Sequence, residues 1–284
     1  MTYFCRTAPS TLRREHYFMK HSSNSLWILA VITLSSSCAS PVISPPAKNS
    51  TSDSLQTTQQ EQSSLIPQQA PLQLGPDIRV DRRKSEVIIR AQIASRNGFL
   101  EQLVCKAGTR EHESLLAVEA APKMIHAALL AAGFTPGSPG SWTETQPDAS
   151  GKSVVNFQPP TGSKIELFVR WDDDGRINER ALCEWVRGVS PNNSSTTLIA
   201  FPCDRFLFAG SHIRPNPKSL GPGEHYVADY TGSVVGLVTF GDEVIAFEEV
   251  IPDRVDVAPA MWESWTDRIP VEGTPIELIF RHPK

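Results

Sequence analysis

Short runs of aliphatic, β-branched and aromatic residues alternate with Gly, Asp, Asn and Pro along the C-terminal two thirds of the chain. Runs of this length, bounded by turn-forming residues, are typical of β-strands. Asn97-Gly98 and Gly241-Asp242 suit tight hairpins, so we expect antiparallel pairing by default. The pattern predicts strands at 86–94, 99–105, 114–119, 164–171, 205–210, 233–240, 243–247 and 275–280.

One segment, 122–132, follows a helical period instead. Pro122 can occupy a first turn without losing a needed hydrogen bond, and Gly133 stands where a left-handed cap ends a helix. Apolar residues recur on one face at Ile125, Ala128, Leu129 and Ala132. We therefore predict an α+β, β-rich fold, a mainly antiparallel sheet with this principal helix packed on it. His126 lies on the flank of the apolar stripe, which favours a half-buried structural histidine over a ligand.

The chain begins with a pattern that indicates export. From Met19, a candidate true start codon, the sequence gives a basic residue, Lys20, then an apolar run over 26–34 and small residues up to Cys38. This is the three-part plan of a secretory signal, and its apolar run is shorter than the about 20 residues that span a bilayer. A twin-arginine signal at Arg13-Arg14 is a weaker alternative, because charged rather than apolar residues follow it.

Cys38 is the predicted lipidation site, because a cysteine after an apolar run and small residues resembles the acylation site of a bacterial lipoprotein. Ser35 stands where such signals usually carry leucine. Two alternatives remain open: cleavage after Ala39 by ordinary signal peptidase, giving a secreted or periplasmic soluble protein, and a retained anchor. The preferred localisation is exported and lipid-anchored at the cell envelope.

After the signal, the amino-acid composition divides the chain into two parts. Residues 39–75 are rich in Ser, Thr, Gln and Pro, which predicts a disordered tether, and 76–284 form one predicted globular domain. Residues 1–38 hold four of the 27 basic and one of the 31 acidic residues, so the remainder carries a net charge of −7. Nucleic acid is therefore not an expected partner, and the basic stretch RVDRRK (79–84) is expected to solvate the start of the domain.

Three cysteines follow the signal. An oxidising compartment permits a disulfide, and Cys183 with Cys203 is the favoured pair, which leaves Cys105 as a small buried hydrophobe. Neither CxxC nor a Cys/His spacing typical of zinc or iron–sulfur sites is present, so we expect no metal and no cofactor.

Two stretches suggest binding sites but have plainer explanations. WDDDGRINE (171–179) resembles a calcium loop, yet its first and last ligand places would be Arg170 and Ala181, so a hairpin turn at Asp174-Gly175 is favoured. Trp262 and Trp265 could stack on a sugar, but core packing is the favoured role.

The sharpest candidate for chemistry is TREHESLL (109–116). No second histidine follows His112 at the spacing of H-E-x-x-H, which excludes that zinc motif. On an extended chain His112 and Ser114 lie roughly 6 to 7 Å apart at their β-carbons and Glu113 faces the other way, a poor arrangement for a triad. The candidate functional cluster is Glu111, His112, Glu113, Ser114, Cys105 and His126. We expect residues 112–114 to act mainly as a folding device.

TREHESLL followed by APKMIHAALLAAGFTPG resembles the signature of YdjY-like bacterial domains. WDDDGR, DYTGSVVGLVTF and GTPIELIF resemble later blocks of that family, so the resemblance covers about 76–284. It implies an exported or envelope-associated domain of unassigned biochemical role, and it carries over no catalytic residue. Some relatives are described as ferredoxin-like because of clustered cysteines, which this chain lacks, so we expect no iron–sulfur cofactor.

Three functions follow as hypotheses. The first is a noncatalytic binding or structural module for an unknown envelope ligand or protein, attached to the membrane by the lipid anchor. The second is a hydrolase or metal-assisted enzyme using His112, Glu113 and Ser114. The third is a redox role for Cys105, which lacks a visible resolving partner.

Overall fold

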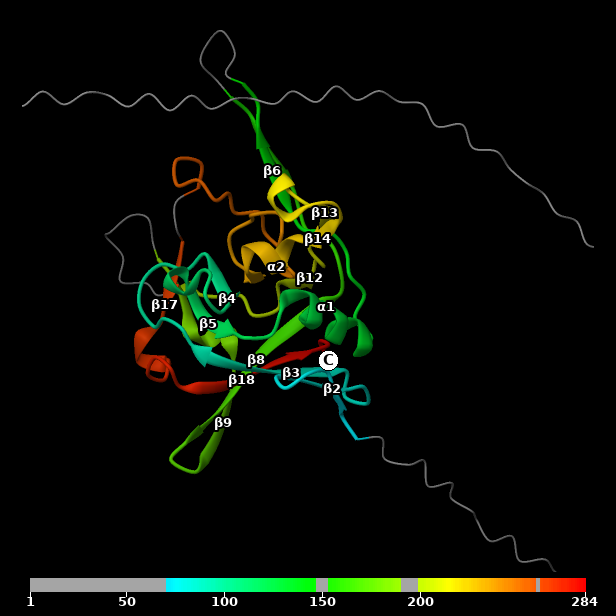
Figure 1. Cartoon of the computed structure of the whole chain (residues 1–284). Coiled ribbons are helices and arrows are strands. Elements are labelled where there is room, and N and C mark those ends of the chain that lie inside the picture. Colours follow the sequence, from blue (N-terminus) through cyan, green and yellow to red (C-terminus); the bar gives the residue numbers. More distant parts are fainter. Residues whose placement is uncertain (1–69, 147–152, 190–198, 259–260) are drawn as a thin grey trace, which may run out of the picture. The chain divides into compact units, whose positions relative to one another are not determined.

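Eight strands close into a barrel in the computed structural model, which describes residues 70–146, 153–189, 199–258 and 261–284 (Figure 1). The predicted signal, Cys38 and residues 39–69 of the predicted tether lie outside the described residues. The end of the predicted tether at residue 75 is wrong, because Leu72 and Gln73 already pair with Val80 and Arg79 in the sheet. In ring order the barrel strands are β3 (Glu86–Ile93), β18 (Pro275–Arg281), β8 (Lys164–Asp173), β12 (Phe206–Phe208), β16 (Ile245–Phe247), β15 (Ser233–Gly236), β4 (Gln102–Lys106) and β5 (Ser114–Val118).

Pairing of β5 with β3 closes the ring, through Ala91 opposite Val118 and Ile93 opposite Leu116. Neighbouring strands are antiparallel at every step but two, because β4 runs parallel to β5 and β15 runs parallel to β16. The prediction of a β-rich, mainly antiparallel fold is confirmed. The sheet is nevertheless a closed, mixed barrel, which periodicity along single strands does not reveal.

Shorter elements decorate the barrel. β1 (Leu72–Gln73) and β2 (Ile78–Asp81) extend the sheet beyond β3, and β9 (Arg176–Ala181) pairs with β8. The small sheets outside the barrel are β6 (Ser141–Glu144) with β7 (Val155–Gln158), β13 (Ile213–Pro215) with β14 (Glu224–Tyr226), and β10 (Val186–Gly188) between β11 (Ile199–Ala200) and β17 (Trp262–Ser264). The 3-10 turns are η1 (Glu111–Glu113), η2 (Leu182–Trp185), η3 (Lys218–Leu220) and η4 (Thr266–Arg268).

The predicted helix is present as α1 (Pro122–Ala131), with Pro122 in its first turn and Gly133 beyond its end at a φ of 93°. Ile125, Ala128 and Leu129 are buried, as the stripe requires. α1 follows the end of β5, and the short α2 (Val227–Thr231) precedes the start of β15. Strand directions place these two points at the same end of the barrel, where both helices lie (Figure 1).

Three hairpin expectations have different outcomes. Asp173 pairs with Arg176 across Asp174-Gly175, both of which have positive φ, so the hairpin favoured over a calcium loop is confirmed. The hairpins expected at Asn97-Gly98 and Gly241-Asp242 are wrong. β3 does not pair with β4, and β15 and β16 are parallel, so the second dipeptide belongs to a connection that returns along the barrel.

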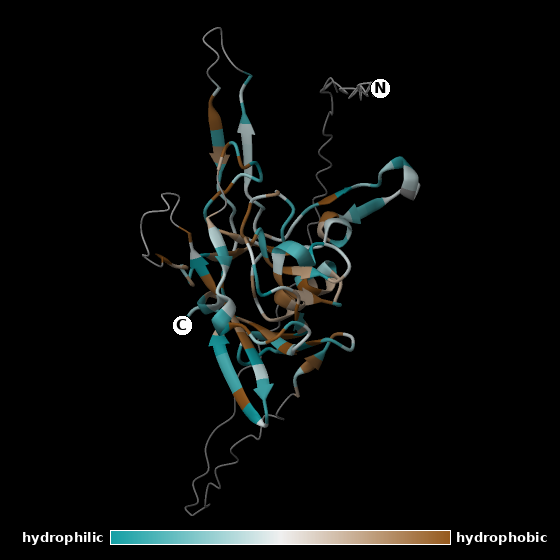
Figure 2. Ribbon diagram, turned by 90° about the vertical axis from the view of Figure 1, so that its left-hand side faces the viewer, coloured by the Kyte–Doolittle hydropathy of each residue, from teal (hydrophilic) through white to brown (hydrophobic). Residues whose placement is uncertain are grey.

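Alternation along β8 separates the core from the outer face. Ile165, Leu167 and Val169 are buried inside, whereas Phe168 and Arg170 point outward. Hydrophobic segments gather in the barrel, while the β8–β9 hairpin at the bottom is largely hydrophilic (Figure 2). The projecting hairpin therefore gains little from apolar burial.

An ion-pair network covers the outer face of β2, β3, β18, β8 and β9. Arg170 contacts Glu277 at 3.0 Å and Glu179 at 2.7 Å, and Arg281 contacts Glu179 at 2.7 Å and Glu86 at 2.6 Å. Ile279 lies between Glu277 and Arg281 on β18 and is fully buried although it faces outward. The aliphatic parts of these charged side chains therefore cover Ile279 and shield it from solvent.

We predict that Arg281→Met lowers the free energy of unfolding by about 2 kcal/mol, because it leaves the nearly buried carboxylate of Glu86 without its partner. Arg79→Met, at a more exposed pair with Glu277, should cost less than about 1 kcal/mol. Urea unfolding of both variants measures the difference, and equal costs would show that the network contributes only surface pairs.

Candidate functional site

The segment EHES ends the connection between two parallel strands. Since β4 and β5 run in the same direction, residues 107–113 must return along the barrel before β5 begins. The Glu111 carboxylate accepts a hydrogen bond from the Gly108 amide, and Gly108 has a φ of 79°. Glu111 therefore stabilises the turn of this connection.

Ser114 and His112 do not form a nucleophile and base. Ser114 is fully buried, and its hydroxyl donates to the Arg110 carbonyl at 2.8 Å. The His112 side chain is 78% exposed, and its Nε2 lies 3.5 Å from Glu113 Oε2. Ser114 thus fixes the chain, while His112 faces solvent.

Cys105 is brought next to Ser114, but in a closed environment. The thiol is fully buried, with the Ser114 hydroxyl and the Arg110 backbone as hydrogen-bond neighbours. Burial raises the pKa of the Cys105 thiol, which disfavours the reactive thiolate. The buried position of Cys105 therefore does not support a redox role for this residue.

His126 lies apart from this segment, on α1. Its Nδ1 is 3.1 Å from the Gly210 carbonyl and 2.9 Å from the Tyr226 hydroxyl, and its ring contacts Phe208 edge-on. Burial lowers the pKa of His126, so the ring is neutral at physiological pH. The structure does not bring His126 together with residues 111–114, and Tyr226 is a partner that the sequence did not indicate.

A cavity of about 110 Å³ opens beside Glu113. Its apolar wall includes Phe99, Val238, Ile251 and Trp262, and its polar wall consists of Glu101, Glu113 and Asp253. Phe99 is 52% exposed at the mouth. The cavity therefore combines an apolar surface with three carboxylates.

The carboxyl groups of Glu101 and Glu113 are neighbours, and the Glu101 amide donates a hydrogen bond to the Glu113 carbonyl at 3.1 Å. Burial, and then the negative charge of Glu113, raise the pKa of Glu101 above its ordinary value. The Arg110 guanidinium lies 3.6 Å from Glu113 and 4.1 Å from the centre of the Phe240 ring. Glu101 therefore holds its proton more tightly than an isolated carboxyl group, and Arg110 is the cation paired with Glu113.

Sequence reasoning identified Glu113 but missed Glu101, Arg110 and Asp253. Arg110 stands inside TREHESLL, but its role depends on Phe240, far along the chain. Glu101 meets Glu113 because β4 and β5 are parallel neighbours, with Gln102 opposite Ser114. No local pattern signals that pairing.

The other sequence candidates fall elsewhere. The structure joins Cys183 and Cys203 by a disulfide, with their Cα atoms 5.3 Å apart. Trp262 packs edge-on against Phe201 at 4.6 Å, and the face of Trp265 is covered by Arg268 at 3.3 Å. Both rings are thus engaged within the protein rather than free to form a sugar platform.

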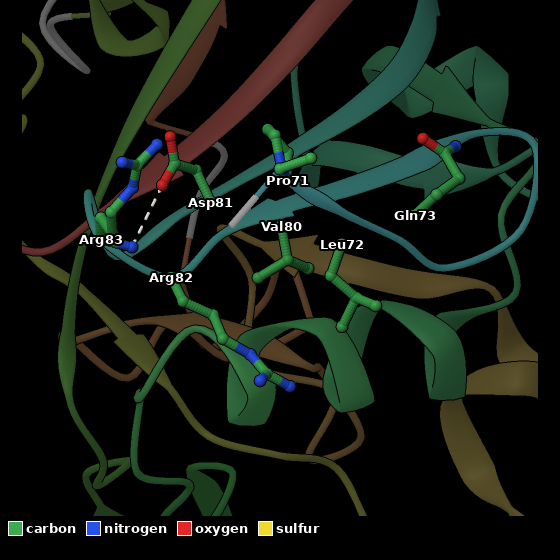
Figure 3. A pocket seen from close by; sticks show the side chains of 8 residues that line it. Pro71, Leu72, Gln73, Val80, Asp81, Arg82 and Arg83 are labelled. Carbon is green, nitrogen blue, oxygen red and sulfur yellow. Dashed lines mark hydrogen bonds between the residues drawn. The ribbon is translucent and has the colours of Figure 1, made fainter. Parts of the chain in front are cut away.

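The basic side chains of the stretch 79–84 do not gather on one face of the protein. The stretch borders a cavity of about 470 Å³ beside β1, where the Arg82 and Arg83 side chains point in different directions (Figure 3). The Asp81 carboxylate accepts from the Arg83 amide at 3.0 Å, and Arg79 pairs with Glu277. Interspersed acids therefore weaken any basic face here.

Within the described ranges, no three His, Cys, Asp or Glu side chains converge in a way that could hold a metal ion. No helix in the described part of the chain is both long and apolar enough to cross a membrane.

These features define the class: a mixed β-barrel domain with helices at one end and a carboxylate-walled cavity beside the EHES segment. The YdjY domain model matches residues 78–281, and the chain belongs to the YdjY domain family. The match runs from the first residue of β2 to the last of β18 and so includes the whole barrel. No curated protein and no solved structure matches the chain significantly.

The structure places the folding role of the EHES segment on Ser114 more than on His112. We predict that Ser114→Ala lowers the free energy of unfolding by about 1 to 2 kcal/mol, because it removes a buried hydrogen bond to a backbone carbonyl. His112→Ala should change it by no more than about 0.5 kcal/mol, since the side chain is largely exposed. Thermal and denaturant unfolding test both, and a larger loss for His112→Ala would reverse the assignment.

Proposed function

We propose that this protein is a noncatalytic binding domain held at the cell envelope, and that its ligand enters the cavity beside Glu113. The observation that carries the proposal is that the neighbouring carboxyl groups of Glu101 and Glu113 line the same, largely apolar cavity. Asp253 adds a third carboxylate to this wall. Negative groups on an apolar surface favour a ligand that carries a positive charge on an apolar stem.

A lysine or arginine side chain of an extended peptide has that chemistry, because its methylene stem covers apolar surface while its charged end meets carboxylates. Binding of a cation favours the ionised form of the pair, so affinity should rise with pH through the raised pKa of Glu101. The partner expected from the sequence, an unidentified envelope ligand or protein, is consistent with such a side chain.

Attachment to the envelope rests on the sequence, because residues 19–38 lie outside the described residues. The basic start, apolar run and Cys38 support a lipid anchor, and the Ser-, Thr-, Gln- and Pro-rich residues that precede β1 would provide the tether between anchor and barrel. The domain would then sample ligands close to the membrane surface.

We predict that metabolic labelling with a radioactive fatty acid marks the wild-type protein and that Cys38→Ala abolishes the label and releases the protein from membranes. The anchor supplies the membrane affinity, and membrane fractionation measures its loss. A wild-type chain that is unlabelled and soluble would replace the anchor with ordinary secretion.

A second function has one specific observation in its favour. Two carboxyl groups in contact, one of them holding its proton more tightly, are the elements of general acid–base hydrolysis. The hydrolase hypothesis based on His112, Glu113 and Ser114 would then run through Glu113 and Glu101, because Ser114 is buried and His112 faces solvent.

A peptide-binding experiment separates these functions. The probes are synthetic hexapeptides with one Lys between apolar residues, matched with the same peptides carrying norleucine, and calorimetry on the full chain measures affinity. We predict that the Lys peptides bind at least about tenfold more tightly than the norleucine peptides, and that Glu113→Gln removes this preference, because a charge-assisted contact is lost. Glu119→Gln, at an exposed site just beyond the end of β5 and so at the far end of that strand from Glu113, is the matched control.

Equal affinity for both peptide sets would refute the cation-binding proposal. Mass spectrometry of the same mixtures reports cleavage. Hydrolysis that is lost in Glu101→Gln and Glu113→Gln would establish the enzyme in its place.

A further inference from the structure

Glu243 is a buried carboxyl group that the proposed ligand site does not use. It lies in the connection 237–244 between the parallel strands β15 and β16 and is 1% exposed. Its Oε1 accepts hydrogen bonds from the amides of Phe240, at 2.5 Å, and Gly241, at 3.1 Å. Its Oε2 is buried and has no hydrogen-bond partner among the described residues.

Few charges surround this group. Gly236 of β15 packs against the Glu243 side chain so closely that a β-carbon there would lie 2.5 Å from Glu243 Cγ. The backbone of Ser211 donates to the Glu243 carbonyl at 2.9 Å. Asp242, next in the chain, is the ionisable neighbour, and its negative charge opposes ionisation of Glu243.

The connection that Glu243 holds touches the Glu101–Glu113 pair at two points. The Glu101 carbonyl accepts from the amides of Leu237, at 2.9 Å, and Val238, at 3.0 Å. The Phe240 ring lies under the Arg110 guanidinium, which pairs with Glu113. A displacement of this connection therefore moves the backbone of Glu101 and the ring that packs against the cation paired with Glu113.

We propose that Glu243 is a proton-operated latch, which holds the connection 237–244 closed when it is neutral and releases it when it ionises. In the neutral form the carbonyl oxygen binds the Phe240 and Gly241 amides, and no buried charge is present. Loss of the proton to solvent strengthens the two amide hydrogen bonds to Oε1, but it leaves a buried charge whose second oxygen has no donor among the described residues. The desolvation cost outweighs that gain, so water must enter to solvate the carboxylate. Entry of water requires the connection to separate from β15.

The direction of the pH dependence follows from linkage. Burial raises the pKa of Glu243 to about 7, above its value in an open, solvated connection. The closed form therefore binds the proton more tightly, and its stability falls as pH rises through about 7. The latch depends on Glu243 alone and does not require the ligand assigned to the cavity.

Hydrogen exchange of the Phe240 and Gly241 amides in the full chain measures opening directly. After correction for the intrinsic base-catalysed rate, we expect their protection to fall about tenfold between pH 6 and pH 8. Glu243→Gln, which matches the neutral carboxyl in shape, should keep both amides protected at pH 8. Glu248→Gln, at a more exposed carboxylate that follows β16 and pairs with Arg205, should retain the tenfold fall.

A side-chain carbon NMR titration of wild-type Glu243 provides a measurement that needs no variant. A midpoint near pH 7 with matching loss of protection supports the latch. A midpoint near the ordinary value of glutamate, or protection of Phe240 and Gly241 that is the same at pH 6 and pH 8, overturns it. Binding of basic peptides without a pH-dependent opening would leave the ligand site standing and remove only the latch.

Discussion

Closure of the barrel through two parallel strand pairs is the constraint on which the rest of the structure depends. A parallel partner cannot be reached by a tight turn, so the chain must travel back along the barrel before each second strand begins. Residues 107–113 and 237–244 are these returning connections. The EHES segment lies at the end of the first, and Glu243 lies near the end of the second.

Each returning connection is held by a carboxylate that binds an amide three residues earlier. Glu111 binds the Gly108 amide and is partly exposed, whereas Glu243 binds the Phe240 amide and is buried. A backbone segment without a strand partner must satisfy its amides in some other way, and side-chain acceptors provide this. The same carboxylate-to-amide contact occurs in both connections, but at Glu243 the carboxyl group is buried, and burial favours its neutral form.

Local patterns predicted the parts of the fold that local physics determines. The apolar stripe and terminal Pro and Gly identified α1, and short β-branched and aromatic runs bounded by turn residues identified β8 and β18. Pairing between distant strands has no such local signal, so Gly241-Asp242 suggested a hairpin where the chain instead returns to a parallel strand. For the same reason Glu113 was identified from its own segment, whereas Glu101 becomes significant only once β4 and β5 lie side by side.

The geometry of the EHES segment separates its structural from its chemical residues. A nucleophile must be accessible and a base must reach it, yet Ser114 is buried on a backbone carbonyl and His112 extends into solvent. Glu113 differs from both, because it contacts Glu101, Arg110 and the cavity. Since Arg110 also lies over Phe240, the two returning connections meet at one cation. A change in either connection therefore alters the surroundings of the carboxyl pair, so the same contact both joins the two connections of the fold and sets the electrostatics of the cavity wall.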